Sequence, residues 1–336
     1  MVWPWRTHTR RRAWFKALVA VAIIAGPFTL PRQTYAFCRT TTDPIPENFP
    51  VLTQCYTGGL PLFWRNACVG YSINRSVTSN MTLDTATTII DKAFATWSNT
   101  TCPASGDKVG ITADDLGPVD CDEVNFNPNG PNQNVIIFRD SWPYNDPYNT
   151  LGLTTVTFNV NTGEIVDADM ELNATGAKLT TTDSVPSTGY DLQSIVTHEA
   201  GHFFGLAHST NPDATMYPAY TPGTSSLREL TSDDIAGICS IYPDVTERTV
   251  DTSVIASGIL AAGPCDPTPK HGFTSSCDAA SPSESSKGCS VGATSSNSQS
   301  SGFALGLVLA SVAAAIRRRM GQTRGSAPTT NQNAYS

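Results

Sequence analysis

Three of the five histidines in the chain lie within residues 198–208, which read HEAGHFFGLAH. On a helix, His198 and His202 are four residues apart and project from one face, so both imidazoles can reach one metal ion. Gly205 can adopt a positive φ, which lets the chain turn and return His208 as a third ligand. Three protein ligands leave a fourth zinc position for water, as in catalytic sites. The string therefore predicts a catalytic zinc held by His198, His202 and His208.

Glu199 lies beside the face that carries these histidines and does not have to bind the metal. A carboxylate in this place can act as general base, taking a proton from water that attacks a carbonyl group and passing it to the departing amine. The predicted reaction is therefore metal-assisted hydrolysis of a carbonyl–nitrogen bond. The alternative is a folded but inactive metal-binding domain, although the presence of Glu199 argues against it.

Three helices and several strands are predicted around this string. A helix should begin near Thr82 and bury an apolar stripe that ends at Trp97. Asp191 is a plausible N-cap for the helix that carries the histidines, and Thr231 with Asp234 resembles a capping box before a third helix that ends at Tyr242. Strands are predicted at 68–74, 134–139, 153–160 and 163–172. Strands followed by late helices indicate an α+β layered domain.

The HExxHxxGxxH string is the zinc signature of the metzincin metalloproteases, which this chain resembles. Met216 follows His208 by eight residues, where the Met-turn of that family belongs. Within the metzincins the chain looks most like a matrixin over roughly residues 65–243, since Ser209 follows the third histidine and Pro218 stands where astacins and serralysins place a tyrosine ligand. Segments 93–98, 214–218 and 230–238 are also similar to matrixin sequence.

The resemblance implies a metzincin-like catalytic domain with a twisted, mostly parallel β-sheet, three main helices, and the zinc site between the active-site helix and the Met-turn. It also implies that an extended substrate pairs with an edge strand near 163–172, and that the loop after Met216, with Tyr217, Tyr220 and Pro222, shapes a specificity pocket. No matrixin cysteine-switch motif precedes the domain. The second, structural zinc of matrixins is not expected, because the remaining histidines lie at positions 8 and 271.

Asp167, Asp169 and Glu171 alternate along one predicted strand and so share a face. Three neighbouring carboxylates repel one another unless water screens them or a cation joins them. The first interpretation is a solvated face of an edge strand, and the alternative is a calcium site. Phe203 and Phe204 are expected to be packing residues.

Composition and charge distribution limit the class of protein and the kinds of partner that the chain could bind. The chain has 336 residues and 40% hydrophobic residues, which excludes a wholly disordered chain and a multi-pass membrane protein. Ten of its 21 basic residues lie in 1–36 and 317–336, so 11 basic residues face 29 acidic ones in between. Such a body repels phosphate backbones, and no nucleic-acid partner is expected.

Both ends of the chain indicate export. In residues 1–36, basic residues precede the apolar run 17–25, and Thr34-Tyr35-Ala36 offers a signal-peptidase site. RRAWFK at 11–16 also resembles a twin-arginine signal, so the Sec and Tat routes stay open. At the other end, Gly288-Cys289, the apolar run 303–316 and an arginine cluster resemble the C-terminal sorting tails of myxobacterial surface proteins. The alternative is a transmembrane anchor, although the 14 apolar residues are fewer than the roughly 20 that a spanning helix needs.

The predicted organisation is a signal peptide at 1–36, a catalytic domain at 37–245, a Ser/Pro/Gly-rich stalk at 246–300, a hydrophobic segment with the arginine cluster at 301–319, and a polar tail at 320–336. The expected protein is an exported, monomeric zinc endopeptidase that acts on proteins or peptides. It would lie outside the cell or at its surface, with membrane or surface contact through the tail. The alternative function is an anchored surface binding or adhesion module with an inactive metzincin fold.

Nine cysteines fit an exported protein. Without Cys289 the remaining eight form an even set, which favours disulfides over metal thiolates. Eight cysteines permit 105 connectivities. The expectation is pairing between near neighbours in sequence: Cys55 with Cys68, Cys102 with Cys121, and Cys265 with Cys277.

Overall fold

The computed structural model describes residues 36–144, 150–175, 178–277 and 322–326. The chain divides into two compact units, Met1–Thr34 and Tyr35–Ser336, and all of the described residues belong to the second. The expected signal peptide up to residue 35, the Gly288-Cys289 motif and the apolar run 303–316 lie outside the described residues. No helix within these ranges is long and apolar enough to cross a membrane.

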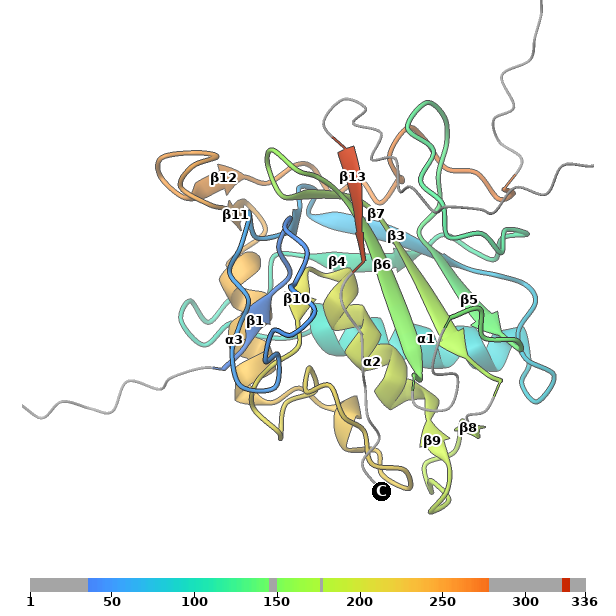
Figure 1. Cartoon of the computed structure of the whole chain (residues 1–336). Coiled ribbons are helices and arrows are strands. Elements are labelled where there is room, and N and C mark those ends of the chain that lie inside the picture. The colour runs from blue at the N-terminus through green and yellow to red at the C-terminus, as the bar shows by residue number, and fades with distance from the viewer. Residues whose placement is uncertain (1–35, 145–149, 176–177, 278–321, 327–336) are drawn as a thin grey trace, which may run out of the picture. The chain divides into compact units, whose positions relative to one another are not determined.

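The centre of the domain is a seven-stranded sheet in the order β13-β6-β7-β5-β3-β4, with β2 also paired to β7 (Figure 1). Strands β4, β3, β5 and β7 lie side by side in this order and run parallel, and β2 is parallel to β7. Strand β6 is antiparallel to β7, and β13 is antiparallel to β6. The mostly parallel sheet expected from the resemblance is confirmed. The strands are β2 (Phe63–Trp64), β3 (Cys68–Ile73), β4 (Thr112–Asp115), β5 (Val135–Arg139), β6 (Gly152–Asn159), β7 (Glu164–Asn173) and β13 (Gln322–Ser326).

Three α-helices form where the sequence predicts them. Helix α1 (Leu83–Ser98) begins after the N-cap Thr82, whose side chain accepts a hydrogen bond from the amide of Thr85. Helix α2 (Leu192–Phe203) begins after Asp191, and α3 (Ser232–Ile241) begins with the capping box of Thr231 and Asp234. The remaining short elements are β1 (Cys38–Arg39), β8 (Leu179–Thr180), β9 (Tyr190–Asp191), β10 (Leu206–Ala207), the 3₁₀ helix η1 (Ser226–Arg228), β11 (Glu247–Thr249) and β12 (Ile259–Ala261).

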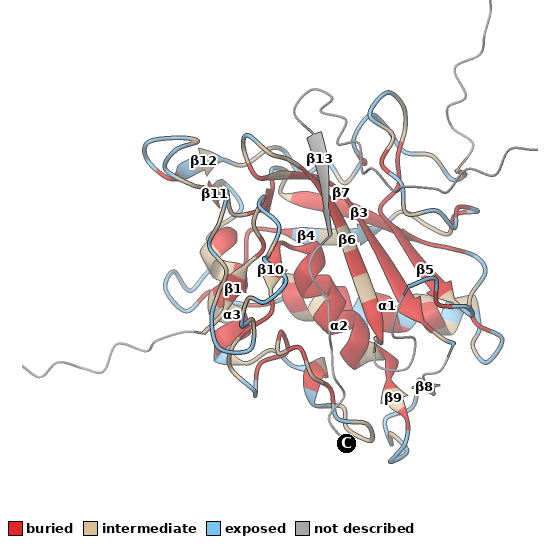
Figure 2. Cartoon of the chain, viewed as in Figure 1, coloured by how far each residue is buried: buried red, intermediate tan, exposed pale blue. Residues whose placement is uncertain are grey.

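Helices α1 and α2 pack against each other below the sheet, and α2 lies against β6 and β7 (Figures 1 and 2). The layer between them is largely aromatic: Phe94 contacts Tyr71, Phe203 and Phe204, and the indole of Trp97 donates a hydrogen bond to the carbonyl of Thr197. Phe203 and Phe204 are fully buried, as expected for packing residues. Burial of these rings fixes the helix that carries the histidines against a rigid layer.

The opposite face of the sheet is also covered. Val135 and Ile137 point away from the helices and form a second, smaller apolar cluster with Val119 and Cys121. The segment around Pro267 lies against β3, since a Cβ on Gly70 would come within 2.3 Å of the Pro267 carbonyl oxygen. The sheet is therefore buried on both faces.

The expected edge strand at 163–172 is wrong. Strand β7 lies between β5 and β6, and β6 in turn pairs with β13, so β7 is an interior strand of the sheet. The side chains of Asp167, Asp169 and Glu171 are buried rather than solvated, because the face that they share is covered. Glu171 accepts hydrogen bonds from Arg139 and Tyr144, and Asp169 accepts one from the backbone amide of Val135.

Within the described ranges, these three carboxylates do not converge as a metal-ligand group. They instead have partners in the protein, as the bonds to Glu171 and Asp169 show. The three carboxylates of β7 therefore do not form a set of ligands for a calcium ion.

Three of the four disulfides among the described residues join distant parts of the chain, and the expected local pairs are wrong. The even set of eight cysteines pairs as Cys38–Cys55, Cys68–Cys265, Cys102–Cys239 and Cys121–Cys277. Three of these bonds close sequence separations of 137 to 197 residues. Such pairs form because the sheet and helices bring their cysteines together, which no local spacing reveals.

Residues 246–277 of the expected stalk belong to the folded body, and residues 278–300 lie outside the described residues. Cys265 and Cys277 fasten this segment to β3 and to the loop before β5. The guanidinium of Arg248 is buried against the ring of Tyr242 and donates hydrogen bonds to the carbonyl oxygens of Trp64, Asn66 and Gly110. The loss of periodicity after residue 246 reflects irregular but packed structure.

Arg248→Met is expected to lower the free energy of unfolding by about 3 kcal/mol or more, since it leaves several buried carbonyl groups without a donor. Urea unfolding monitored by tryptophan fluorescence measures this change. Arg65→Met, at an exposed position nearby, is the matched control and should change stability by less than about 0.5 kcal/mol. Equal stability of the two variants would show that residues 246–277 are not an integral part of the domain.

Candidate active site

Helix α2 places His198 and His202 on one face, and its first turn is held firmly. The carboxylate of Asp191 accepts hydrogen bonds from the amide and hydroxyl of Ser194, at 2.9 and 2.8 Å. Arg228 binds both oxygens of the same carboxylate, with Nε–Oδ2 and Nη2–Oδ1 distances of 2.8 and 2.6 Å. A bidentate pair of this kind fixes direction as well as position, so the helix axis is set before the histidines are reached.

Gly205 ends the helix and turns the chain back. Its φ is +97°, a conformation that an L side chain rarely adopts. The next two residues form β10, which pairs antiparallel with β1 at Cys38 and Arg39. This turn returns His208 to the other two histidines, as the sequence predicts.

The three imidazole rings converge. Their centroids are 5.0 Å apart for His198 and His202, 5.2 Å for His198 and His208, and 4.8 Å for His202 and His208. One nitrogen from each ring lies within 4.8 Å of the others. All three side chains are buried.

The second nitrogen of two rings fixes the tautomer. His198 Nδ1 donates to the carbonyl oxygen of Thr215 at 2.6 Å, and His202 Nδ1 donates to that of Leu206 at 2.9 Å. A carbonyl only accepts, so Nδ1 carries the proton and Nε2 keeps a free lone pair. The Nε2 atoms of His202 and His208 are buried without a hydrogen-bond partner among the described residues. Buried polar atoms of this kind are costly unless they bind something, and a shared metal ion satisfies them.

Burial lowers the pKa of all three imidazoles, and for His202 and His208 the neighbouring rings lower it further; the pKa of His202 falls to about 3. The rings are therefore neutral at physiological pH, the form that binds a metal. Three neutral nitrogen ligands suit zinc, and three rather than four protein ligands are the number found at catalytic zinc sites.

Zinc affinity is expected to change little between pH 8 and pH 6, because protons compete for an imidazole only below its pKa in the folded protein. Three ordinary histidines, each with a pKa near 6.5, would lose about 60-fold in affinity over this range. We expect a loss of less than about tenfold, measured by competition with a chelating dye at both pH values. A full 60-fold loss would mean that the rings titrate as exposed groups.

Glu199 is buried next to His198, and both residues line the same small hollow. Burial raises the pKa of its carboxyl group to about 7, and hydrogen bonds with Thr154 oppose that rise. A carboxyl group that titrates near neutral pH can take up and release a proton under physiological conditions. Glu199 therefore has both the place and the acidity of a general base.

Met216 packs directly below the helix. Gly201 makes room for it, since a Cβ at position 201 would lie 2.1 Å from the sulfur of Met216. Asp234 accepts hydrogen bonds from the backbone amides of Thr215 and Met216, at 2.9 and 3.0 Å. The Met-turn is therefore clamped between α2 and the first turn of α3.

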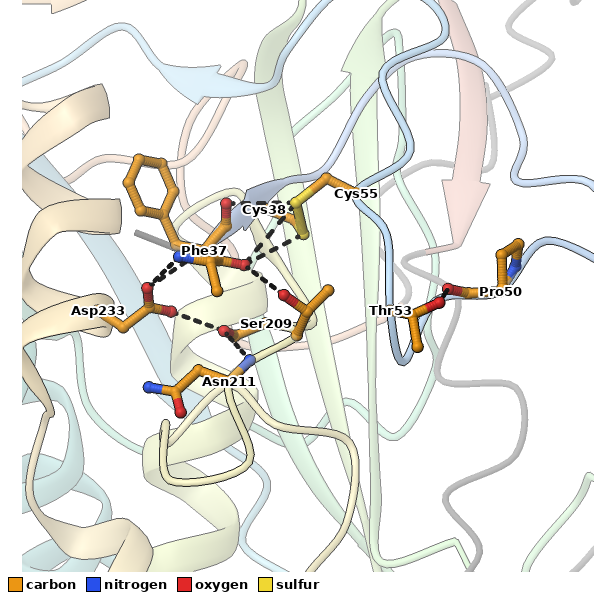
Figure 3. Close-up of a disulfide and its surroundings, with 10 residues drawn as sticks. Phe37, Cys38, Pro50, Thr53, Cys55, Ser209, Asn211 and Asp233 are labelled. Carbon is orange, nitrogen blue, oxygen red and sulfur yellow. Dashed lines mark hydrogen bonds between the residues drawn. A yellow bond between two sulfur atoms is a disulfide. The ribbon is translucent and has the colours of Figure 1, made fainter. Parts of the chain in front are cut away.

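The neighbouring acid, Asp233, holds the loop after His208. It accepts a hydrogen bond from the hydroxyl of Ser209 at 2.6 Å and another from the backbone amide of Phe37 at 3.1 Å (Figure 3). Its side chain is buried beside the Cys38–Cys55 disulfide. The sequence predicts Asp234 only as a helix cap, and it gives no sign that both acids also hold the segments next to the three histidines.

The hollow beside Glu199 is lined mainly by apolar and tyrosine side chains. Tyr217 and Tyr220 contribute, as expected, whereas Pro222 does not. Ala219 of the same loop also lines the hollow, and Leu151, Ile195 and Leu227 contribute from elsewhere in the chain. Their separation in sequence explains why the spacing after Met216 reveals only part of the hollow.

Parts of this chain are similar in sequence to known proteins. Residues 63–243, more than half of the chain, match the family described as Matrixin. The chain is 37% identical to human matrilysin over 103 residues, which are 31% of this chain and 35% of that protein. It is 39% identical to human neutrophil collagenase over 82 residues, which are 24% of this chain and 16% of the collagenase.

A plant protein shows a similar likeness. The chain is 36% identical to metalloendoproteinase 1-MMP of Arabidopsis thaliana over 85 residues, which are 25% of this chain and 22% of that protein. The chain thus spans about a third or less of the length of these relatives.

Proposed function

The chain belongs to the matrixin family, and on this premise we propose that it is a zinc-dependent endopeptidase whose metal ligands are His198, His202 and His208. One observation carries the proposal: three buried imidazoles converge, and the Nε2 atoms of His202 and His208 have no hydrogen-bond partner among the described residues. The buried carboxyl group of Glu199 directly follows His198 in the sequence. A structural zinc site would need a fourth protein ligand, and within the described ranges the cluster contains three.

Zinc in this site would supply a Lewis acid that lowers the pKa of a coordinated water toward neutrality and polarises a peptide carbonyl. Glu199 would accept the proton from the attacking water and deliver it to the amine of the broken peptide bond. Its pKa of about 7 suits both transfers, because the carboxyl group is then neither too weak a base nor too weak an acid. The neutral histidines keep their Nε2 lone pairs for the metal throughout.

An extended substrate would pair its backbone with the outer edge of β6, which starts beside Glu199. In the structure this edge already carries an extended segment of the chain, since β13 pairs antiparallel with residues Thr155 to Asn159. Substrate would take the same edge in place of β13, through main-chain hydrogen bonds. An apolar substrate side chain would enter the hollow lined by Leu151, Ile195 and Leu227.

The enzyme would act outside the cytoplasm. Four disulfides within the described residues support an oxidising compartment. The signal sequence at 1–36 and the tail that follows Cys289 would direct export and surface attachment. There the enzyme would act as a monomer on protein or peptide substrates.

Cleavage of casein by the purified chain, with and without a chelator, tests the proposal. We expect hydrolysis with zinc, no hydrolysis after treatment with 1,10-phenanthroline, and recovery when zinc is added back. An intact substrate in every condition, together with stoichiometric zinc, would instead indicate a binding module with an inactive metzincin fold.

A further inference from the structure

The first residues of β6 face the carboxylate of Glu199. Thr154 is fully buried, and its hydroxyl lies 2.8 Å from Oε2 of Glu199 and 3.2 Å from the carbonyl oxygen of the same residue. A hydroxyl has one proton to donate, and a charge-assisted bond to a carboxylate is stronger than one to a neutral carbonyl. The proton therefore goes to Oε2.

Gly152 lies on the other side of the same carboxylate. A Cβ at this position would come within 2.7 Å of Oε1, 2.8 Å of Cγ and 2.9 Å of Cδ of Glu199. The φ of Gly152 is not positive, so the backbone conformation does not require glycine there. What requires glycine is the space that the carboxylate occupies.

We propose that Thr154 is a positioning residue for the general base, and that Gly152 provides the space in which the base is held. An isolated carboxylate rotates freely about its last torsion angle and offers either oxygen. Donation from Thr154 ties Oε2 to β6, which leaves Oε1 as the oxygen that accepts the proton. The β-branched side chain of threonine suits this task, since its χ1 is restricted.

Strand β6 would therefore have two roles in the site. The strand that would bind the substrate backbone also orients the base that acts on the bond. The backbone of Thr154 pairs with that of Met170 in β7, an interior strand, so the sheet fixes the position of the residue that carries the hydroxyl. This inference rests on the proposed proteolytic function.

Thr154→Val tests the role of the hydroxyl, because valine keeps the shape and β-branching, removes the hydroxyl donor and leaves the hydrogen bond from the backbone of Thr154 to the carboxyl group in place. With zinc-loaded protein and a fluorogenic peptide, we expect kcat to fall about 10- to 100-fold, KM to change less than about twofold, and zinc content to stay at one per chain. Thr154→Ser keeps the donor and should stay within about threefold of the wild-type kcat. Thr88→Val is the matched control, since Thr88 is exposed on helix α1 and the loss of its hydroxyl should leave kcat within about twofold.

A second variant tests the space that Gly152 leaves for the carboxylate of Glu199. Gly152→Ala should displace the carboxylate and lower kcat at least as far as Thr154→Val, again with zinc retained. Crystal structures of the wild-type, Thr154→Val and Thr154→Ser proteins give a readout that does not depend on turnover. We expect Glu199 in the wild-type orientation with serine at position 154, and rotated or present in two conformers with valine.

Three results would overturn the inference. The first is a normal kcat for Thr154→Val alongside an active wild type. The second is a Thr154→Ser variant as slow as the valine variant, since the hydroxyl would then not be the cause. The third is loss of zinc or a collapse of thermal stability in Thr154→Val, which would assign Thr154 a structural role. If zinc-loaded wild type cleaves no peptide at all, the proposed function itself fails and this inference fails with it, a result distinct from the other three.

Discussion

Glu199→Gln is expected to lower kcat by about 10²- to 10⁴-fold while zinc stays bound. Glutamine has nearly the same shape as glutamate, and its carbonyl oxygen can still accept the hydrogen bond from Thr154. An amide cannot take up a proton at neutral pH, so the transfer from water to the leaving amine is lost. Steady-state kinetics with a peptide substrate, together with zinc analysis by mass spectrometry, measures both effects.

Glu229→Gln is the matched control for this variant. Glu229 is exposed, and the same change of charge there should leave kcat within about twofold. If Glu199→Gln kept near-normal turnover, another group would be the base. If it lost zinc, Glu199 would be part of the metal-binding set rather than the proton carrier.

His202→Ala is expected to abolish both zinc binding and hydrolysis. Partners that only orient a metal ligand typically contribute 10- to 100-fold in affinity, so removal of a ligand should cost more than about 100-fold. The variant should also lose the stability that bound zinc adds to the folded state, about 3–4 kcal/mol when zinc is present at several hundred times its Kd. Zinc content after dialysis and thermal unfolding with and without EDTA report the two losses.

His271→Ala provides the comparison for His202→Ala. His271 is exposed and lies outside the cluster, so the change should alter neither the zinc content nor the effect of EDTA on the melting temperature. The Glu199 and His202 variants together separate the two roles, because one loses activity with zinc bound and the other loses both. A His202→Ala protein that kept one zinc per chain would contradict the ligand assignment.

The sequence predicts the helices and the convergence of the three histidines because both follow from local spacing. A stripe at helical periodicity locates α1, and caps at Asp191 and Thr231 locate the starts of α2 and α3. His198 and His202 need only one helix to meet, and Gly205 needs only one turn to add His208. Chemistry that depends on a dozen consecutive residues can be inferred without the fold.

Features that depend on the order of strands could not be predicted in this way. The alternating acids at Asp167, Asp169 and Glu171 have the pattern of an exposed face, but β6 adds outside β7 and the segment up to Cys277 covers the sheet. Likewise, Cys68 and Cys265 are 197 residues apart and meet only because that segment returns to β3. Composition after residue 246 indicated a stalk, since packing through backbone carbonyls and Arg248 leaves no periodic apolar pattern.

The supports of the site are the least visible from sequence. Asp233 and Asp234 bind backbone amides and a hydroxyl, and Thr154 contacts a residue 45 positions away. None of these contacts has a spacing rule, because each joins two elements that meet only in the folded domain. These contacts hold the segments around the three histidines and Glu199 in a fixed geometry.

The coordination of zinc in the purified wild-type chain is the most direct test of the site. X-ray absorption at the zinc edge, on protein reconstituted with one equivalent of zinc, reports the type and distance of the ligands. We expect one zinc per chain with three imidazole nitrogens and one oxygen, at about 2.0–2.1 Å, and no sulfur. A chain that binds no zinc, or that holds it through sulfur at about 2.3 Å or through four imidazoles, would contradict a catalytic site built from His198, His202 and His208.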